Sequence, residues 1–158
     1  MKHLIPIASA LLAASIAHAE DVPLKNCPPR VRETIKSELG NGKLDDIERV
    51  HLKGRTRYIV EIDVRRGGDL KLLIRPDGKL LSTATDTSYK FCPAKVRRAI
   101  DKHLEKGGKL DDIDILRSGG FVRYHVEIDR RGQPDLELTI SRDGKIHNRR
   151  KGESDTWF

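Results

Sequence analysis

Hydrophobic positions along the chain follow a helical period first and a strand period afterwards. Val31, Ile35 and Leu39 are four residues apart, which predicts the apolar stripe of a helix. Apolar side chains at 58, 60, 62 and 64 then alternate with mostly polar ones, and residues 70–75 alternate in the same way. Such alternation is typical of antiparallel strands that bury one face. A further strand is expected at 47–52, and turn residues lie at 66–69 and 76–79.

The whole pattern occurs twice. Cys27, Val31, Ile35 and Leu39 return as Cys92, Val96, Ile100 and Leu104, and the strand residues return at a nearly equal offset. The sequence therefore predicts an α+β protein of two tandem modules, each with one helix packed on a roughly four-stranded antiparallel sheet. The expected division is a signal peptide at 1–19, module 1 at 20–82, a linker at 83–90, module 2 at 91–150 and a C-terminal tail at 151–158.

The first residues have the pattern of an export signal. A short basic start at Met1–His3 precedes an apolar run at 4–16, and Ala17-His18-Ala19 fits the small-x-small cleavage rule. The run is shorter than the roughly 20 apolar residues that a membrane-spanning helix needs, and no later stretch is apolar for as long. We expect cleavage before Glu20 and a periplasmic or secreted protein.

Each expected module has one cysteine, placed just before its helix. Because exported proteins meet an oxidising environment, the sequence predicts a Cys27–Cys92 disulfide that joins the modules. Such a bond closes a long loop and would stabilise the fold by a few kcal/mol. A bond between two chains is the alternative, whereas a reactive thiol is disfavoured because the chain has no Cys-x-x-Cys motif.

Signatures of catalysis and of metal binding are missing from the sequence. No nucleophile elbow occurs, and the histidines are not spaced as zinc ligands. Asp45-Asp46 and Asp111-Asp112 form repeated acidic pairs, which could contribute to a calcium site but lack the alternating oxygen ligands of a calcium loop. A turn start or the capping of local N–H groups explains them equally well. We expect no enzyme, no cofactor and no metal site.

The charge of the chain raises the question of anionic partners. The net charge is +7, and +6 once Lys2 leaves with the signal peptide, but basic and acidic residues are interspersed. Only 4% of residues are aromatic, whereas sheets that bind nucleic acid stack bases on exposed aromatic rings. Nucleic-acid binding is therefore not expected, and weak contact with anionic envelope polymers or lipids is the alternative function.

The motifs together resemble a known family. Each module has a helix opened by proline, a Tyr-x-Val-Glu-Ile-Asp strand at 58–63 or 124–129, a Leu-x-Leu strand and an Asp-Gly-Lys turn. In tandem behind a signal peptide, this pattern resembles the PepSY-like family, which is related to the repeat of the β-lactamase inhibitor protein. The resemblance covers nearly all of the chain after the signal peptide. It implies a helix on a four-stranded antiparallel sheet, a periplasmic or secreted location and no catalysis.

In the inhibitor protein, two such repeats present a concave sheet surface to a target enzyme. The present sequence has one cysteine per module, so a disulfide within a module is impossible. Inhibition of a β-lactamase in particular is therefore not implied.

The strand alternation itself points to the same surface. If a helix covers one face of each sheet, the other face is left open to solvent or to a partner. The candidate binding residues on these open faces are Arg57, Ile59, Glu61, Asp63, Lys71, Leu73 and Arg75 in module 1, and Arg123, His125, Glu127 and Asp129, with Glu137, Thr139 and Ser141, in module 2. We hypothesise that they bind an unidentified envelope or secreted protein, and that the chain inhibits or regulates it. An ordinary solvated face is the alternative, because alternation alone predicts polar residues there.

Overall fold

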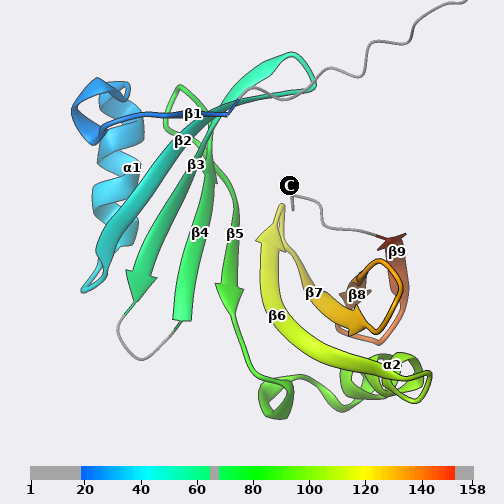
Figure 1. Ribbon diagram of the computed structural model, residues 1–158. Coiled ribbons are helices and arrows are strands. Elements are labelled where there is room, and N and C mark those ends of the chain that lie inside the picture. The colour runs from blue at the N-terminus through cyan, green and yellow to red at the C-terminus, as the bar shows by residue number, and fades with distance from the viewer. Residues whose placement is uncertain (1–18, 65–67, 152–158) are drawn as a thin grey trace, which may run out of the picture.

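The computed structural model describes residues 19–64 and 68–151 (Figure 1). Two α-helices and nine strands occur in these ranges, together with the 3₁₀ turns Leu24–Asn26 and Tyr89–Phe91. In chain order the elements are β1 (Glu20–Asp21), α1 (Pro29–Leu39), β2 (Lys43–Leu52), β3 (Arg55–Val64), β4 (Gly68–Ile74), β5 (Leu80–Asp86), α2 (Ala94–Leu104), β6 (Gly108–Ser118), β7 (Phe121–Arg130), β8 (Leu136–Ser141) and β9 (Ile146–Lys151). The predicted signal peptide, except Ala19, and the tail beyond Lys151 lie outside the described residues.

All nine strands belong to one antiparallel sheet, in which each strand pairs with its neighbours in chain order. The two modules are joined within this sheet, because β5 pairs with β6 from Ser82↔Ser118 to Asp86↔Asp114. The α+β class is therefore confirmed, but the strands form one sheet instead of two separate ones. Residues 83–86 of the expected linker belong to β5 and are thus part of the sheet.

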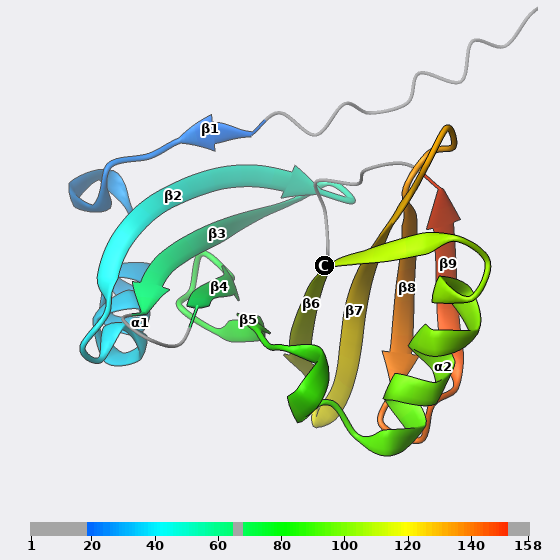
Figure 2. The same ribbon diagram turned by 60° about the horizontal axis from the view of Figure 1, so that its bottom comes forward.

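The helices form where the sequence predicted them. A proline precedes each one, and its fixed φ angle suits the first turn of a helix, where a missing N–H is not needed. Val31 and Ile35 of α1 are buried against a core that includes Val60 and Ile62 of β3. Helix α2 buries its own apolar stripe in a second core, which includes Val126 of β7. Figures 1 and 2 show α1 beside the first half of the sheet and α2 beside the second half.

Both helices lie on the same side of the sheet. The register links Thr85 of β5 to Ile115 of β6, and Ile115 in turn to the core residue Tyr124 of β7. Because paired residues of adjacent strands project to one face, the core side continues without a break from module 1 to module 2. The opposite side, which neither helix covers, is called the open face below.

The strands β2 and β6 are longer than expected. Each has an irregular register near its start, between Leu44 and Asp46 in β2 and between Leu110 and Asp112 in β6. A bulge of this kind adds one residue to a strand and breaks the alternation of apolar and polar side chains. The acidic pairs that could have started a turn or capped local N–H groups therefore lie inside strands.

The two cysteines are free thiols in separate cores. Cys27 is 4% exposed and Cys92 is 2% exposed, and each Sγ lies 3.8 Å from a backbone carbonyl four residues earlier in the chain. The predicted Cys27–Cys92 bond is therefore wrong for this structure. Each side chain, placed just before its helix, fills space in the core of its own module as a small apolar group.

Candidate functional site

The open face carries the candidate residues that alternate with the core. On β3, Arg57, Ile59 and Glu61 project away from α1, because their neighbours Tyr58, Val60 and Ile62 belong to the core. Lys71 and Leu73 of β4 lie opposite Glu61 and Ile59 in the ladder, so they share this face. On β7, Arg123, His125 and Glu127 alternate with core residues in the same way.

Several of these residues contact one another. The Nζ of Lys71 lies 3.0 Å from Oε1 of Glu61, across the β3–β4 ladder. The Nε2 of His125 lies 3.5 Å from Oε1 of Glu127. Leu73 and His125 are only 7% and 5% exposed, so they are built into the floor of the open face and are not ordinary surface side chains.

Other candidate residues lie at the margin. Arg75 follows the end of β4 and pairs with Asp77 in the turn that leads to β5. Asp63 lies near the end of β3, opposite Lys43, and Asp129 lies near the end of β7, opposite Lys109. These three side chains are therefore peripheral to the central part of the open face.

A hollow of about 770 Å³ lies on the open face where the modules meet. Strands from β4 to β9 contribute to its lining, which includes Leu73, Ser82, Leu116, Arg123, Thr139 and Asn148. Phe121 belongs to the same lining, at the start of β7, and is 69% exposed. The lining combines apolar, hydroxyl and cationic groups, a combination suited to docking another molecule.

Sequence analysis missed most of this hollow. It identified Leu73, Arg123 and Thr139 but not Leu116, Phe121 or Asn148. One signal was available, because Phe121 follows the Gly119-Gly120 turn while its counterpart in module 1 is Arg55. An aromatic residue at a solvent-facing strand start, in one repeat only, points to a role that the repeats do not share.

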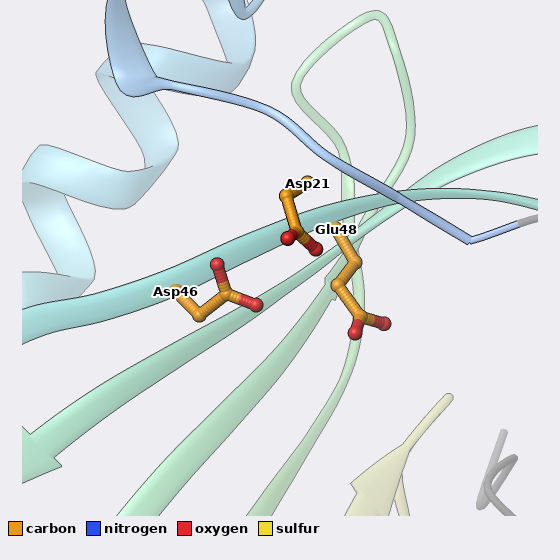
Figure 3. A group of neighbouring side chains, drawn as sticks. All are labelled: Asp21, Asp46 and Glu48. Atoms are coloured by element: carbon orange, nitrogen blue, oxygen red, sulfur yellow. The ribbon is translucent and has the colours of Figure 1, made fainter.

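The open face also carries a group of three carboxyl groups in each module. In module 1 these belong to Asp21 of β1 and to Asp46 and Glu48 of β2 (Figure 3). In module 2 they belong to Asp86, Asp112 and Asp114. Within each group, one oxygen of every residue lies within 4.8 Å of the others, so either group could hold a cation. We call these groups the module 1 triad and the module 2 triad.

The triads are structural counterparts. Asp21 lies opposite Glu48 in the β1–β2 ladder, as Asp86 lies opposite Asp114 in the β5–β6 ladder. The next residue along the chain donates the same hydrogen bond in both modules, from Val22 N to Ile47 O and from Thr87 N to Ile113 O, each at 2.8 Å. Sequence analysis noticed Asp46 and Asp112 but not the other members of the triads, of which Asp21 and Asp86 lie far away in the chain.

The two triads differ in burial and therefore in electrostatics. Asp114 is 2% exposed, whereas its counterpart Glu48 is half-buried. The pKa of Asp114 is raised to about 8, first by burial and then by the negative charges of Asp112 and Asp86. The pKa of Glu48 is also raised, by burial first and then by the neighbouring Asp46. Burying a carboxylate among carboxylates disfavours its charged form.

Among the described residues, no helix is both long enough and apolar enough to cross a bilayer.

Comparison with known proteins identifies the family of the chain. The chain matches the family model described as "Putative beta-lactamase-inhibitor-like, PepSY-like" twice, over residues 14–82 and 82–148.

Solved structures share the fold at low sequence identity. A BLIP-like protein from Bacteroides fragilis is 18% identical, with a TM-score of 0.63, over 87% of this chain and 94% of that one. A DUF2874 family protein from Bacteroides uniformis is 17% identical, with a TM-score of 0.65, over 79% and 89%. A "putative periplasmic" protein from Bacteroides eggerthii is 16% identical, with a TM-score of 0.66, over 79% and 88%. Since the two family matches together span most of the sequence, the chain belongs to the PepSY-like family and contains two copies of its unit.

Proposed function

We propose that this protein is a non-enzymatic binding module that docks another protein on its open face, outside the cytoplasm. The export pattern of residues 1–19 supports the location, as does the likeness to a "putative periplasmic" protein. The family description, which is inhibitor-like, supports a role in restraining or regulating the partner.

The observation that carries the proposal is the hollow at the junction of the modules. Its lining includes the exposed aromatic ring of Phe121 together with Leu116 and Leu73. Binding energy in protein interfaces is concentrated in such aromatic anchors and in the pockets around them. A solvated sheet face needs neither a hollow nor an exposed phenylalanine.

The charges around the hollow indicate what it receives. Lys79, Arg123 and His147 contribute to its lining and are exposed, and the lining includes no acidic side chain. An apolar side chain of the partner, followed by an aspartate or glutamate, would match this arrangement. We therefore propose that the partner inserts a loop or extended segment of that composition.

The test compares variants of the chain that begins at Glu20. Phe121→Thr removes the anchor but keeps a residue that favours strands, and Arg123→Glu reverses a charge in the hollow. Arg57→Glu is the matched control, because Arg57 is the counterpart of Arg123 in module 1 and lies outside the hollow. Each immobilised protein is exposed to an envelope extract, washed at low and high salt, and the retained proteins are quantified by mass spectrometry.

We expect one stoichiometric partner that survives high salt on the wild type and on Arg57→Glu, and that is lost on both hollow variants. Equal retention by all four proteins would contradict docking in the hollow. Material that is anionic and lost at high salt would instead favour the basic surface as the binder, since phosphate and sulfate contacts weaken steeply with salt.

A further inference from the structure

The tail beyond β9 carries the kinds of group that the hollow is suited to receive. Residues 152–158 read Gly-Glu-Ser-Asp-Thr-Trp-Phe, with two acidic side chains, two aromatic ones and no basic one. The hollow has the opposite charge, since the described residues that line it include Lys79, Arg123 and His147 but no acidic residue. The inference below rests on the proposed function in taking the hollow as a binding surface, and it concerns a segment of the chain itself as an occupant.

The positive charges at the hollow are available to an incoming acidic group. Among the described residues, neither Lys79 nor Arg123 has an ion-pair partner, and both are exposed. Leu81 and Leu116 of the same lining are half-buried. An aromatic ring that covers these leucines would remove further apolar surface from water. The hollow can therefore hold a ring and a carboxylate at the same time.

The spacing of the tail residues suits docking in an extended form. Glu153, Asp155 and Trp157 are two residues apart, so an extended segment projects all three side chains to one face. That face presents two carboxylates and an indole ring in a row, with about 7 Å from each to the next. The partner segment proposed above combines the same kinds of group, an apolar side chain and an acidic one, in the opposite order along the chain.

The tail also starts close enough to reach the hollow. Asn148 of β9 lines the hollow, and β9 ends three residues later at Lys151, a distance on the order of 10 Å along a strand. Trp157 follows Lys151 by six residues, and an extended segment of that length spans up to about 20 Å. Because β9 is an edge strand of the sheet, the chain can turn back over the open face without crossing a neighbouring strand.

We propose that residues 152–158 dock in the hollow of their own chain, with Trp157 on the leucines and Asp155 near Arg123, and that the partner displaces them. Because the segment is tethered, its docking is intramolecular and needs no high intrinsic affinity. The partner binds only those molecules whose hollow is open, so its apparent affinity is reduced by that fraction. The tail thereby sets a threshold for binding of the partner.

The tail carries its own spectroscopic probe. Trp157 is the single tryptophan of the chain, so its emission and its quenching by acrylamide report on the tail alone. The proteins compared are the chain that begins at Glu20 and its variants Arg123→Glu, Asp155→Arg and the two combined. Arg57→Glu is the matched control, because Arg57 is the counterpart of Arg123 in module 1 and lies outside the hollow.

We expect the emission of the parent chain to be blue-shifted relative to the same chain in denaturant. Acrylamide should quench it at least about twofold less than in Arg123→Glu or Asp155→Arg, which corresponds to a tail docked in half of the molecules or more. The combined variant regains the protection because its reversed charges attract again. Arg57→Glu keeps the protection, and neither readout changes with protein concentration.

Three results would overturn the proposal. Full quenching in the parent chain would show that the tail does not dock. Protection that Arg123→Glu leaves intact would show that the ring packs on another part of the molecule. Protection that grows with protein concentration would show that the tail enters the hollow of a second copy.

These measurements need no partner, so they separate this inference from the proposed function. Protection of Trp157 without any captured partner would support docking of the tail and contradict only the proposed function. Once a partner is captured, we expect it to bind Asp155→Arg at least about twofold more tightly than the parent chain, since the competing tail is released. Equal affinity for the two proteins would contradict the competition and leave the docking of the partner in place.

Discussion

Asp86 lies directly opposite Asp114 in the ladder between β5 and β6, so the pairing that joins the two modules also brings two carboxyl groups together. Asp112 adds a third from the same strand. The backbone pairing that joins the modules therefore brings together three carboxyl groups, which repel one another when they are charged. This arrangement leads to a prediction on proton binding that can be measured.

The stability of the protein is expected to fall with rising pH. The pKa of Asp114 is raised from its ordinary value of 3.8 to about 8, first by burial and then by Asp112 and Asp86. Between these values the folded chain keeps a proton that the unfolded chain releases, so the free energy of unfolding decreases as pH rises across this window. Lys71 of β4 moderates the effect, because its positive charge interacts with Asp114, and His125 of β7 lies opposite Asp114 in the ladder.

The measurement is denaturant unfolding in the presence of chelator at several pH values. In Asp114→Asn the decrease across the window is expected to be smaller than in the wild type, because the titrating group is gone. At the alkaline end of the window the variant should be the more stable of the two. Identical profiles would show that Asp114 does not hold the extra proton.

Gly144 is expected to resist substitution. It has a φ angle of +86° in the β8–β9 turn, and an added Cβ would lie 2.6 Å from the carbonyl oxygen of Lys95 at the start of α2. Gly144→Ala therefore combines an unfavourable backbone conformation with a steric clash, together about 2–4 kcal/mol.

The matched control is Gly120→Ala, where φ is +82° but nothing lies within 4 Å of the added atom. This variant is expected to lose only about 1–2 kcal/mol, from the backbone conformation alone. Thermal or denaturant unfolding of the two proteins gives the difference. Equal losses would mean that the turn does not pack against α2 as the structure has it.

Local periodicity was enough to predict the helices and the strands with regular alternation. Ile35 and Ile100 are fully buried on the stripes expected for them, and Val60 and Val126 lie in the cores. The pairing of β5 with β6 could not be predicted in this way. Residues 82–88 are rich in serine and threonine, which are common in linkers, although β-branched threonine also suits strands.

The sequence predicted which face of the sheet carries the candidate site, but not where on that face the site lies. Alternation identified Arg57 and Arg123 as solvent-facing, because a two-residue period is a local property. The hollow depends on six strands lying side by side. Each triad forms because Asp21 or Asp86, which precedes a helix in the chain, pairs with the strand that follows that helix. The bulges hid the triads further, since the extra residue breaks the alternation before Asp46 and Asp112.

The cysteines are expected to remain reduced and unreactive in the native protein. Burial raises the pKa of both thiols, while Arg32 and Arg97 lower the pKa of Cys27 and Cys92 by a smaller amount. A buried thiol reacts only when the fold opens, so alkylation should be at least about 100-fold slower than in denaturant. Mass spectrometry after alkylation in denaturant without reductant should show two labels. An unlabelled chain, lighter by two hydrogen atoms, would restore the disulfide predicted from the sequence.

Phe121 should matter to binding and not to folding. Its side chain is 69% exposed, so Phe121→Thr removes little buried area and keeps a residue that favours strands. We expect the free energy of unfolding to change by less than about 0.5 kcal/mol. A partner that uses the ring as an anchor should lose at least about 2 kcal/mol of binding free energy, or about 30-fold in affinity. Unfolding and titration of the same two proteins separate these quantities. A large loss of stability would mean that the ring supports the junction of the modules, whereas unchanged affinity for a captured partner would move the binding surface away from the hollow.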